Sequence, residues 1–248
     1  MTRSPREIRP VAVGRYRYSK WRWRVLVRAF DTVGSAGMWA WRLARPPRTV
    51  ASPRRILVVQ LDHLGDAVLT SPLLERLRAA YPAAAIDVLA SPGNREVFEA
   101  DPNIRHVHVA ARSWFDRRRG HVALASAVWQ LGVSLRRERY DLGIDVRGDV
   151  LSVLVLALAG IPRRLGWAMG GGGFLLTDVA PWVAGRHEVA SRLALVERLG
   201  IHDDEPARVS VPVSDDDGIR VGLLLSAAWG GPRGRARRAV RARLAGSG

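Results

Sequence analysis

Short apolar runs alternate with longer amphipathic segments over most of the chain. Five runs read as strands. Three are rich in Val, Ile and Leu, at 56–59, 85–90 and 142–146, and two are more polar, at 105–109 and 164–167. Segments with apolar residues at helical spacing lie at 69–80, 95–100, 121–140, 150–159 and 187–200. Strands that alternate with helices predict an α/β fold with a doubly wound parallel sheet, because helices must cover both faces of such a sheet.

The stretch 54–82 combines a buried strand, a small polar turn and an amphipathic helix. In an open α/β sheet, ligands collect beyond the carboxyl ends of the strands, where helix N-termini offer free N–H groups. Gly65 would let a ligand approach the backbone closely, and Asp66 places a carboxylate beside it. We therefore expect the chemistry of this protein at the turn that contains these two residues.

Composition excludes several classes of protein. The chain has 248 residues, of which 48% are hydrophobic, so it can bury a substantial core. It has no cysteine, which excludes disulfides and thiolate chemistry and fits a reducing compartment. No secretory signal pattern opens the chain, and its longest apolar run, 150–161, is shorter than the roughly 20 residues that span a bilayer. These features predict a cytoplasmic protein without a membrane-spanning helix.

The net charge of +16 is unevenly distributed. Residues 1–50 hold 12 Lys or Arg against 2 Asp or Glu, and residues 218–248 hold 7 Arg and no acidic residue. Residues 51–217 hold 20 basic and 21 acidic residues, so the expected folded body is close to neutral. Because no nucleic-acid recognition motif accompanies the terminal charges, we do not expect a nucleic-acid partner.

Residues 1–53 read as a basic, Trp-rich arm that ends in a proline-containing linker, 45–53. Aromatic and basic side chains alternate over 15–42, a composition that suits the headgroup region of an anionic membrane. Two other interpretations remain open. The arm is either a helix that packs on the domain with a solvated basic face, or a partly disordered segment.

Three blocks carry a resemblance to a known family. ILVVQLDHLGDAVLTSPLLERLRAAYP, YDLGIDVRGDVLSVLVLALAGIPRRLGW and HEVASRLALVERLGI resemble, in this order and spacing, the N-terminal half of glycosyltransferase family 9, the heptosyltransferases of the lipopolysaccharide inner core. The resemblance covers about residues 54–214. It implies a GT-B arrangement of two Rossmann-like domains, with the acceptor on the N-terminal domain and the nucleotide-sugar on the C-terminal one. It also implies inverting, metal-independent transfer from a donor such as ADP-heptose to a lipid-linked anionic saccharide, without a cofactor.

The resemblance implies that Asp66 is the general base that takes a proton from the acceptor hydroxyl. The structural alternative is a carboxylate that stabilises its own helix from the N-terminus. Beside it, His63 either positions an acceptor hydroxyl or makes a structural hydrogen bond, and Gly65 is expected against the acceptor. Asp62 reads as a turn residue rather than a second base.

Three further residues are candidates for acceptor binding because of their position. Asn94 and Arg147 follow the strands at 85–90 and 142–146, at the edge of the sheet where Asp66 is expected. Asn94 also fits ordinary turn chemistry, whereas the Arg147 guanidinium is suited to grip a carboxylate or phosphate. Arg186 precedes the last helix and would complete the pocket, and the adjacent His187 reads as a helix-entry residue.

Other patterns carry no candidate site. The glycine run 170–173 lacks the strand–turn–helix context of a dinucleotide fingerprint and predicts a flexible loop. Residues 117–119 are an arginine run, either a solvated loop or a loop that steers an anionic lipid headgroup. No cluster of His and carboxylates has metal-ligand spacing, and no nucleophile motif is present.

The chain departs from the family pattern at two places. Gln60 stands where the family often has Lys or Arg. Residues 215–248 form a basic, atypical tail where the family continues into its donor domain, and they resemble a truncation or a shifted reading frame. We therefore expect a heptosyltransferase-type domain with weak or no turnover by itself, peripheral on the inner membrane. The alternative is a non-catalytic, membrane-associated domain that binds a glycolipid or a partner protein.

Overall fold

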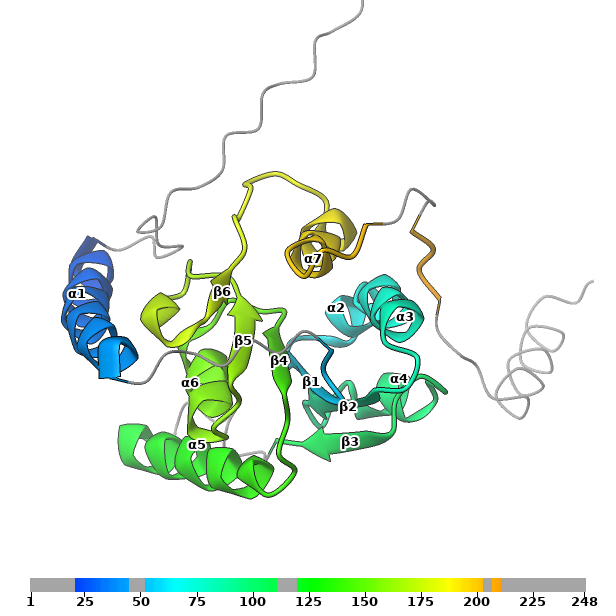
Figure 1. The fold of residues 1–248 in the computed structure, drawn as a ribbon, viewed down its shortest axis with the longest axis horizontal. Helices are drawn as coiled ribbons and strands as arrows, with labels where there is room; N and C mark the ends of the chain where they lie inside the picture. Colours follow the sequence, from blue (N-terminus) through cyan, green and yellow to red (C-terminus); the bar gives the residue numbers. More distant parts are fainter. Residues whose placement is uncertain (1–20, 45–51, 111–119, 203–206, 211–248) are drawn as a thin grey trace, which may run out of the picture. The chain divides into compact units, whose positions relative to one another are not determined.

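Six parallel strands form one sheet in the order β3-β2-β1-β4-β5-β6 (Figure 1). The computed structural model describes residues 21–44, 52–110, 120–202 and 207–210. The strands are β1 Arg55–Gln60, β2 Ala85–Ala90, β3 His106–Val109, β4 Leu142–Asp145, β5 Arg163–Gly166 and β6 Asp178–Val179. The chain proceeds outward from β1 in one direction and from β4 in the other, so the order of the strands reverses between these two neighbours.

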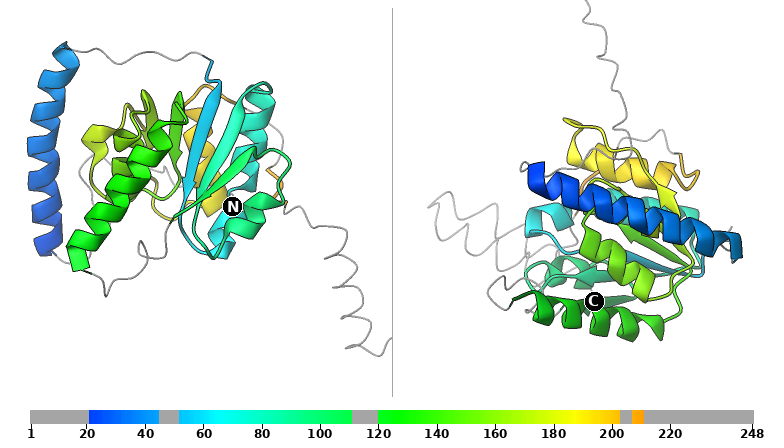
Figure 2. Two further views of the ribbon diagram at one scale, coloured as in Figure 1. Left: turned by 90° about the horizontal axis from the view of Figure 1, so that it is seen from below. Right: turned by 90° about the vertical axis from the view of Figure 1, so that its left-hand side faces the viewer.

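Helices cover both faces of the sheet, as the doubly wound prediction requires. On one face lie α2 Leu64–Val68, α3 Ser71–Ala80, α4 Arg95–Glu99 and α7 Glu188–Glu197, and on the other α5 Gly120–Arg136 and α6 Val150–Leu158. The two views in Figure 2 show α5 and α6 on the opposite side of the strands from α3. The predicted fold class is therefore confirmed.

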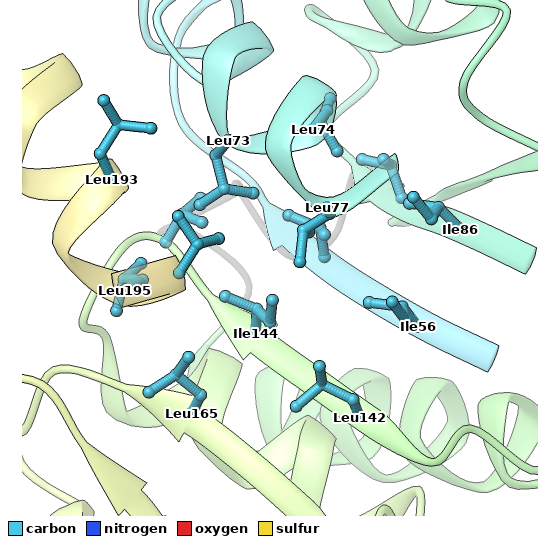
Figure 3. Close-up of a cluster of buried hydrophobic side chains, with 14 of the residues drawn as sticks. Ile56, Leu73, Leu74, Leu77, Ile86, Leu142, Ile144, Leu165, Leu193 and Leu195 are labelled. Atoms are coloured by element: carbon cyan, nitrogen blue, oxygen red, sulfur yellow. The ribbon is translucent and has the colours of Figure 1, made fainter. Parts of the chain in front are cut away.

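Strand β1 shows why this sheet needs apolar residues at every position. Ile56 and Val58 contribute to the core under α3 and α7, whereas Leu57 and Val59 contribute to the core under α5 and α6. All four side chains are fully buried. Figure 3 shows the first of these cores, where leucines of α3 and α7 meet Ile and Leu side chains of the strands. Each such burial stabilises the fold by about 1.5–3 kcal/mol.

The helix predicted at 69–80 is shorter, and a separate helix precedes it. Pro72 has no N–H to offer to a carbonyl of the preceding turn, so α2 ends and α3 begins anew at Ser71. Side-chain hydroxyls take over the freed carbonyls: Thr70 Oγ1 donates to Asp66 O (2.8 Å), and Ser71 Oγ donates to Val68 O (2.9 Å). This break leaves the short helix α2, with Asp66, as a distinct segment after β1.

The glycine run 170–173 is a closely packed turn rather than the open loop that its composition predicts. A Cβ on Gly170 would lie 2.0 Å from the carbonyl oxygen of Gly148. Gly172 has a φ of +74°, which favours glycine, and it precedes the 3₁₀ helix η3, Gly173–Leu175. The run thus brings the segments after β4 and β5 together. The two-residue strand β6, which follows it, was not predicted because it is too short to show a period.

Within the basic arm, the structure describes a 24-residue helix, α1 Trp21–Ala44. Asp31 Oδ1 accepts a hydrogen bond from Gly172 N (2.8 Å), and the rings of Phe30 and Phe174 meet edge to face at 5.3 Å. The helical interpretation of this part of the arm is therefore the one the structure supports. No helix among the described residues combines the length and the apolar character that a membrane crossing requires.

Several predictions fall outside the described residues. They concern residues 15–20 of the arm, the linker up to residue 51, the arginine run 117–119 and the tail 215–248. The domain boundaries at 53 and 214 remain predictions. The last described segment, 207–210, returns to α3, where Ser210 N donates to Ser71 Oγ (3.1 Å).

Candidate functional site

A cavity of about 420 Å³ lies beyond the carboxyl ends of β1 and β4, where the strand order reverses. This is the place at which open α/β sheets bind ligands. Its lining comes from the turns after β1, β4 and β5, from the segment before α7 and from α7 itself: Asp62, His63, Asp66, Val146, Arg147, Gly148, Asp149, Trp167, Met169, Gly170, Trp182, Glu188 and Arg192. The predicted location of the chemistry therefore coincides with this cavity.

Asp66 meets a buried arginine at the cavity. The Arg192 side chain is only 3% exposed, and its NH2 group lies 3.2 Å from Asp66 Oδ1. Its NH1 group lies 3.3 Å from Glu188 Oε2, one turn earlier on α7. Arg192 Nε is buried and has no hydrogen-bond partner. Since the Asp66 side chain is 34% exposed, one of its sides is held by Arg192 while the rest can reach a ligand.

A second ion pair lies across the cavity, in the turns after β1 and β4. Arg147 Nε lies 3.1 Å from Asp62 Oδ1 and 3.9 Å from Asp149 Oδ2. Burial raises the pKa of Asp62 above its ordinary value, and the Arg147 guanidinium offsets part of that rise. Asp149 also begins α6, where its side chain accepts a hydrogen bond from Leu151 N (2.9 Å). Arg147 is thus placed in the cavity by carboxylates on both sides.

A buried carboxyl group supports the turn that carries Arg147. Asp145, the last residue of β4, is fully buried and accepts hydrogen bonds from Arg147 N (3.1 Å) and Gly148 N (2.9 Å). Burial raises the pKa of Asp145 to about 7, against the opposing effect of these two hydrogen bonds. Asp145 does not line the cavity, so its role is to shape the turn.

Two tryptophans, together with Val146 and Met169, form the apolar part of the lining. The Trp167 and Trp182 rings meet edge to face at 5.1 Å, and Trp167 is almost fully buried. Large aromatic surfaces with a few convergent polar groups are typical of small-molecule sites. Among the described residues, no three His, Asp or Glu side chains are grouped so that they could hold a metal ion.

The structure brings three of the predicted site residues together at this cavity, namely Asp66, His63 and Arg147. Gly65 is adjacent and exposed, and a Cβ placed on it would meet nothing within 4 Å. The fold itself therefore does not require glycine at this position. An open position of this kind agrees with a Gly65 that leaves room for a ligand. That role of Gly65 stays a prediction.

Asn94 and Arg186 are not among the residues that line the cavity. Asn94 is fully buried; its Nδ2 donates to Gln60 O (3.1 Å) and Asp62 O (3.0 Å), and its Oδ1 accepts from Ser91 N (2.8 Å). The first two bonds hold the turn after β1 and the third closes the turn after β2, so the structure supports the turn-forming alternative for Asn94. His187 caps α7, with Nδ1 accepting from Val189 N (3.3 Å), as expected of a helix-entry residue.

Gln60, at the position where the family often has a cation, also lies outside the cavity lining. It is fully buried, and its Nε2 donates to Thr70 Oγ1 (3.2 Å). It therefore ties β1 to the break between α2 and α3 and offers no contact to a ligand in this arrangement.

Sequence reasoning missed Arg192, Glu188, Asp149 and both tryptophans as site residues. One signal for Arg192 was present: it lies on the apolar face of its helix, between Val189 and Val196, where a charged side chain needs a partner. No local pattern indicates that this partner is Asp66.

Comparisons with known proteins agree with the geometry, although no family model matches the chain. The lipopolysaccharide heptosyltransferase 2 of Escherichia coli K12 is 34% identical over 114 residues, which are 46% of this chain and 31% of that relative. The solved Escherichia coli ADP-heptose lipopolysaccharide heptosyltransferase II is 27% identical, with a TM-score of 0.55 over 69% of this chain and 50% of its own. Over this domain, the chain is similar to the heptosyltransferases of glycosyltransferase family 9.

A family 9 glycosyltransferase from Veillonella parvula shares the fold, with a TM-score of 0.62 over 75% of this chain and 52% of its own, at 20% identity. The match thus spans less than a third of the length of the curated heptosyltransferase and about half of the two solved chains.

Proposed function

We propose that this domain is the acceptor-binding part of a heptosyltransferase-type glycosyltransferase, with Asp66 as its general base. The observation that carries the proposal is the position of the Asp66 carboxylate. It lies at the cavity between the ends of β1 and β4, part of it in contact with Arg192 and part of it exposed. The relative at 34% identity, a lipopolysaccharide heptosyltransferase, supports this type of reaction.

In the proposed reaction, Asp66 takes the proton from an acceptor hydroxyl while that oxygen attacks the anomeric carbon of the donor. A new C–O bond forms on one face of the sugar, and the bond to the nucleotide diphosphate breaks on the other, so the configuration inverts. A carboxylate in this role contributes about 10²–10⁴ in rate. Arg192 holds Asp66 in place, because a guanidinium beside a carboxylate restricts its rotation and stabilises its charge.

The acceptor saccharide would lie along the cavity, with His63 and Arg147 as hydrogen-bond partners and the Trp167–Trp182 pair as its apolar wall. Asn94 would act indirectly, by holding the turn that ends at Asp62. The donor is an ADP-heptose type of nucleotide-sugar, as the name of the solved relative from Escherichia coli suggests. By the family arrangement, the donor site would lie on a second domain.

The acceptor would be lipid-linked and would reach the domain at the cytoplasmic face of the inner membrane. Helix α1 supports this part of the proposal, since it carries exposed apolar side chains next to exposed arginines, such as Trp21 and Val25 next to Arg22 and Arg28. A helix of this composition can lie on an anionic lipid surface.

Asp66→Asn is the variant that tests the proposal, because the amide keeps the size of the side chain and an oxygen for Arg192. Two quantities are measured: binding of a lipopolysaccharide-core acceptor in detergent micelles, followed by tryptophan fluorescence, and transfer of radiolabelled heptose from ADP-heptose. We expect binding within about twofold of the wild type and any transfer reduced by about 10²–10⁴.

Arg147→Ala serves as the comparison, since it removes a proposed acceptor contact and should weaken binding. Because the donor site would lie on a second domain, acceptor binding by the wild type without heptose transfer fits both the proposed function and the non-catalytic binding domain. A wild-type chain that binds no acceptor would overturn the proposal.

A further inference from the structure

The described lining of the cavity is acidic. It contains twice as many carboxylates as guanidinium groups, and His63 is the only other titratable side chain in it: Asp62, Asp66, Asp149 and Glu188 against Arg147 and Arg192. The formal charge of this lining is therefore negative whatever charge His63 carries. A cavity built to recognise phosphate or carboxylate would show the opposite sign.

Both guanidinium groups already face carboxylates of the same cavity. Arg192 contacts Asp66 and Glu188 at 3.2 and 3.3 Å. Arg147 contacts Asp62 at 3.1 Å and lies 3.9 Å from Asp149. An anionic ligand group would have to displace one of these carboxylates or lie beside it, and like charges at such distances disfavour binding.

The remaining surfaces suit hydroxyl groups and ring faces. Carboxylate oxygens accept hydrogen bonds and donate none when ionised, so Asp62, Asp66 and Asp149 are natural partners of ligand O–H groups. Trp182, which is partly exposed and meets the almost fully buried Trp167 edge to face, supplies an apolar surface of the kind that packs against the C–H face of a pyranose ring. Gln60, where a cation was expected, is fully buried and bonded to Thr70, so it adds no positive charge.

We infer that this cavity selects an uncharged, hydroxyl-rich sugar unit, one without phosphate or carboxylate, as the part of the acceptor that reaches Asp66. The inference rests on the proposed acceptor site and deepens it by naming the substrate class. It differs from the anionic acceptor that the family resemblance implied. Acidic groups elsewhere on a longer acceptor would then lie outside the cavity.

The test compares matched pairs of methyl glycosides that differ only in the C6 group: glucoside and glucuronide, mannoside and mannuronide, galactoside and galacturonide. Binding to the full chain is measured at pH 7.5 and low salt by intrinsic tryptophan fluorescence and by NMR chemical shifts. In every pair that binds, we expect the neutral member to bind at least tenfold more tightly. Added salt should narrow this ratio, because it screens the carboxylates.

Asp62→Asn provides the charge variant and Glu99→Gln its control. Asp62→Asn should shift the ratio of acidic to neutral affinity at least fivefold toward the acidic members. Glu99 lies on α4, outside the cavity lining, in an exposed pair with Arg95, so the same charge change there should alter neither affinity.

Two results would contradict the inference and can be told apart. Equal or tighter binding of the acidic members by the wild type would overturn the inference alone and leave the proposed acceptor site standing. No binding of any glycoside, neutral or acidic, would overturn the inference together with the proposed function.

Discussion

The Arg192 guanidinium lies 3.2 Å from the Asp66 carboxylate, although 126 positions separate the two residues in the chain. The contact joins α7 to the short helix after β1 at the edge of the cavity. It couples the proposed chemistry to stability, because any change at Asp66 also alters the surroundings of a buried cation.

Asp66→Ala should lower the free energy of unfolding by about 1–3 kcal/mol, because it removes a hydrogen-bonded carboxylate from a guanidinium that is only 3% exposed. Glu188→Ala removes the other carboxylate of the same guanidinium, but the Glu188 side chain is 49% exposed. Its loss should cost about 0.5 kcal/mol or less. Urea unfolding followed by tryptophan fluorescence measures both. Equal losses would mean that Asp66 is not the main partner of Arg192.

Asp87, on β2, should make the protein sensitive to acid. Its burial raises the pKa, but hydrogen bonds from Arg105 and Tyr140, with His108 3.9 Å away, outweigh this and hold the pKa of Asp87 well below its usual range. Arg105 Nε and the Tyr140 hydroxyl lie 2.9 and 2.6 Å from its oxygens. The stabilisation is therefore present above the unfolded-state pKa of about 3.9 and is lost as the pH falls below it.

Urea unfolding between pH 2.5 and 7 checks this expectation for Asp87. The wild type should lose more stability than Asp87→Asn as the pH falls, while Asp87→Asn should be the less stable protein at pH 7. Tyr140→Phe removes one of the hydrogen bonds and should cost about 1 kcal/mol at pH 7. Parallel pH curves for wild type and Asp87→Asn would rule out the role of this carboxylate.

Asp145 should have the opposite effect on the pH dependence of stability, because it makes the folded protein less stable as the pH rises. Burial raises its pKa in the folded protein to about 7, so the unfolded chain ionises first as the pH rises from about 4. Stability from this group is complete below pH 4 and falls until about pH 7. Asp145→Asn removes the titration and keeps an oxygen for one of the two N–H groups, that of Arg147 or that of Gly148.

The stability of the wild type relative to Asp145→Asn should therefore fall by up to about 4 kcal/mol between pH 4 and pH 8. Urea unfolding at intervals of one pH unit measures this difference. A constant difference over that range would mean that Asp145 is ionised throughout.

Two glycines near the cavity should respond differently to alanine. Gly65→Ala adds a Cβ that meets nothing within 4 Å, so the melting temperature should stay the same or rise slightly. Gly170→Ala places a Cβ 2.0 Å from Gly148 O and should destabilise the fold clearly. If Gly65 faces the acceptor, Gly65→Ala weakens acceptor binding without a loss in melting temperature. Unchanged acceptor binding would place the ligand elsewhere.

Helix α1 should bind vesicles that contain anionic lipid. Trp21 and Val33 are 67% and 75% exposed, and Arg22 and Arg28 are exposed on the same helix. Arg22→Glu with Arg28→Glu should reduce cosedimentation with vesicles of 30% anionic lipid severalfold, since each basic residue near the surface contributes about 1 kcal/mol. Arg198→Glu, a single exchange at the end of α7, is the control. Equal binding to neutral vesicles would contradict the electrostatic part of this expectation.

Much of the fold could be predicted from local patterns. Successive side chains of β1 point to opposite faces of the sheet, and both sets are apolar: Ile56 and Val58 on one face, Leu57 and Val59 on the other. Such a strand requires a sheet that is covered on both sides. Strands at 85–90 and 142–146 then follow as its parallel neighbours. The helix break at Thr70 was missed, because a side-chain hydroxyl that takes the place of an N–H group leaves no periodic signal in the sequence. Strand β6 was missed because two residues are too few to show a period.

The sequence by itself determined the parallel sheet, the edge at which ligands collect and the presence of Asp66, His63 and Arg147 there, because strand ends and helix starts depend on neighbouring residues. Only the tertiary structure decided which charges face one another. It assigned Arg192 to Asp66 and Asn94 to the turn after β1. The physical reason is that ion pairs form between groups a few ångströms apart in space. Those distances are set by the packing of α7 against α3 and not by the spacing of residues along the chain.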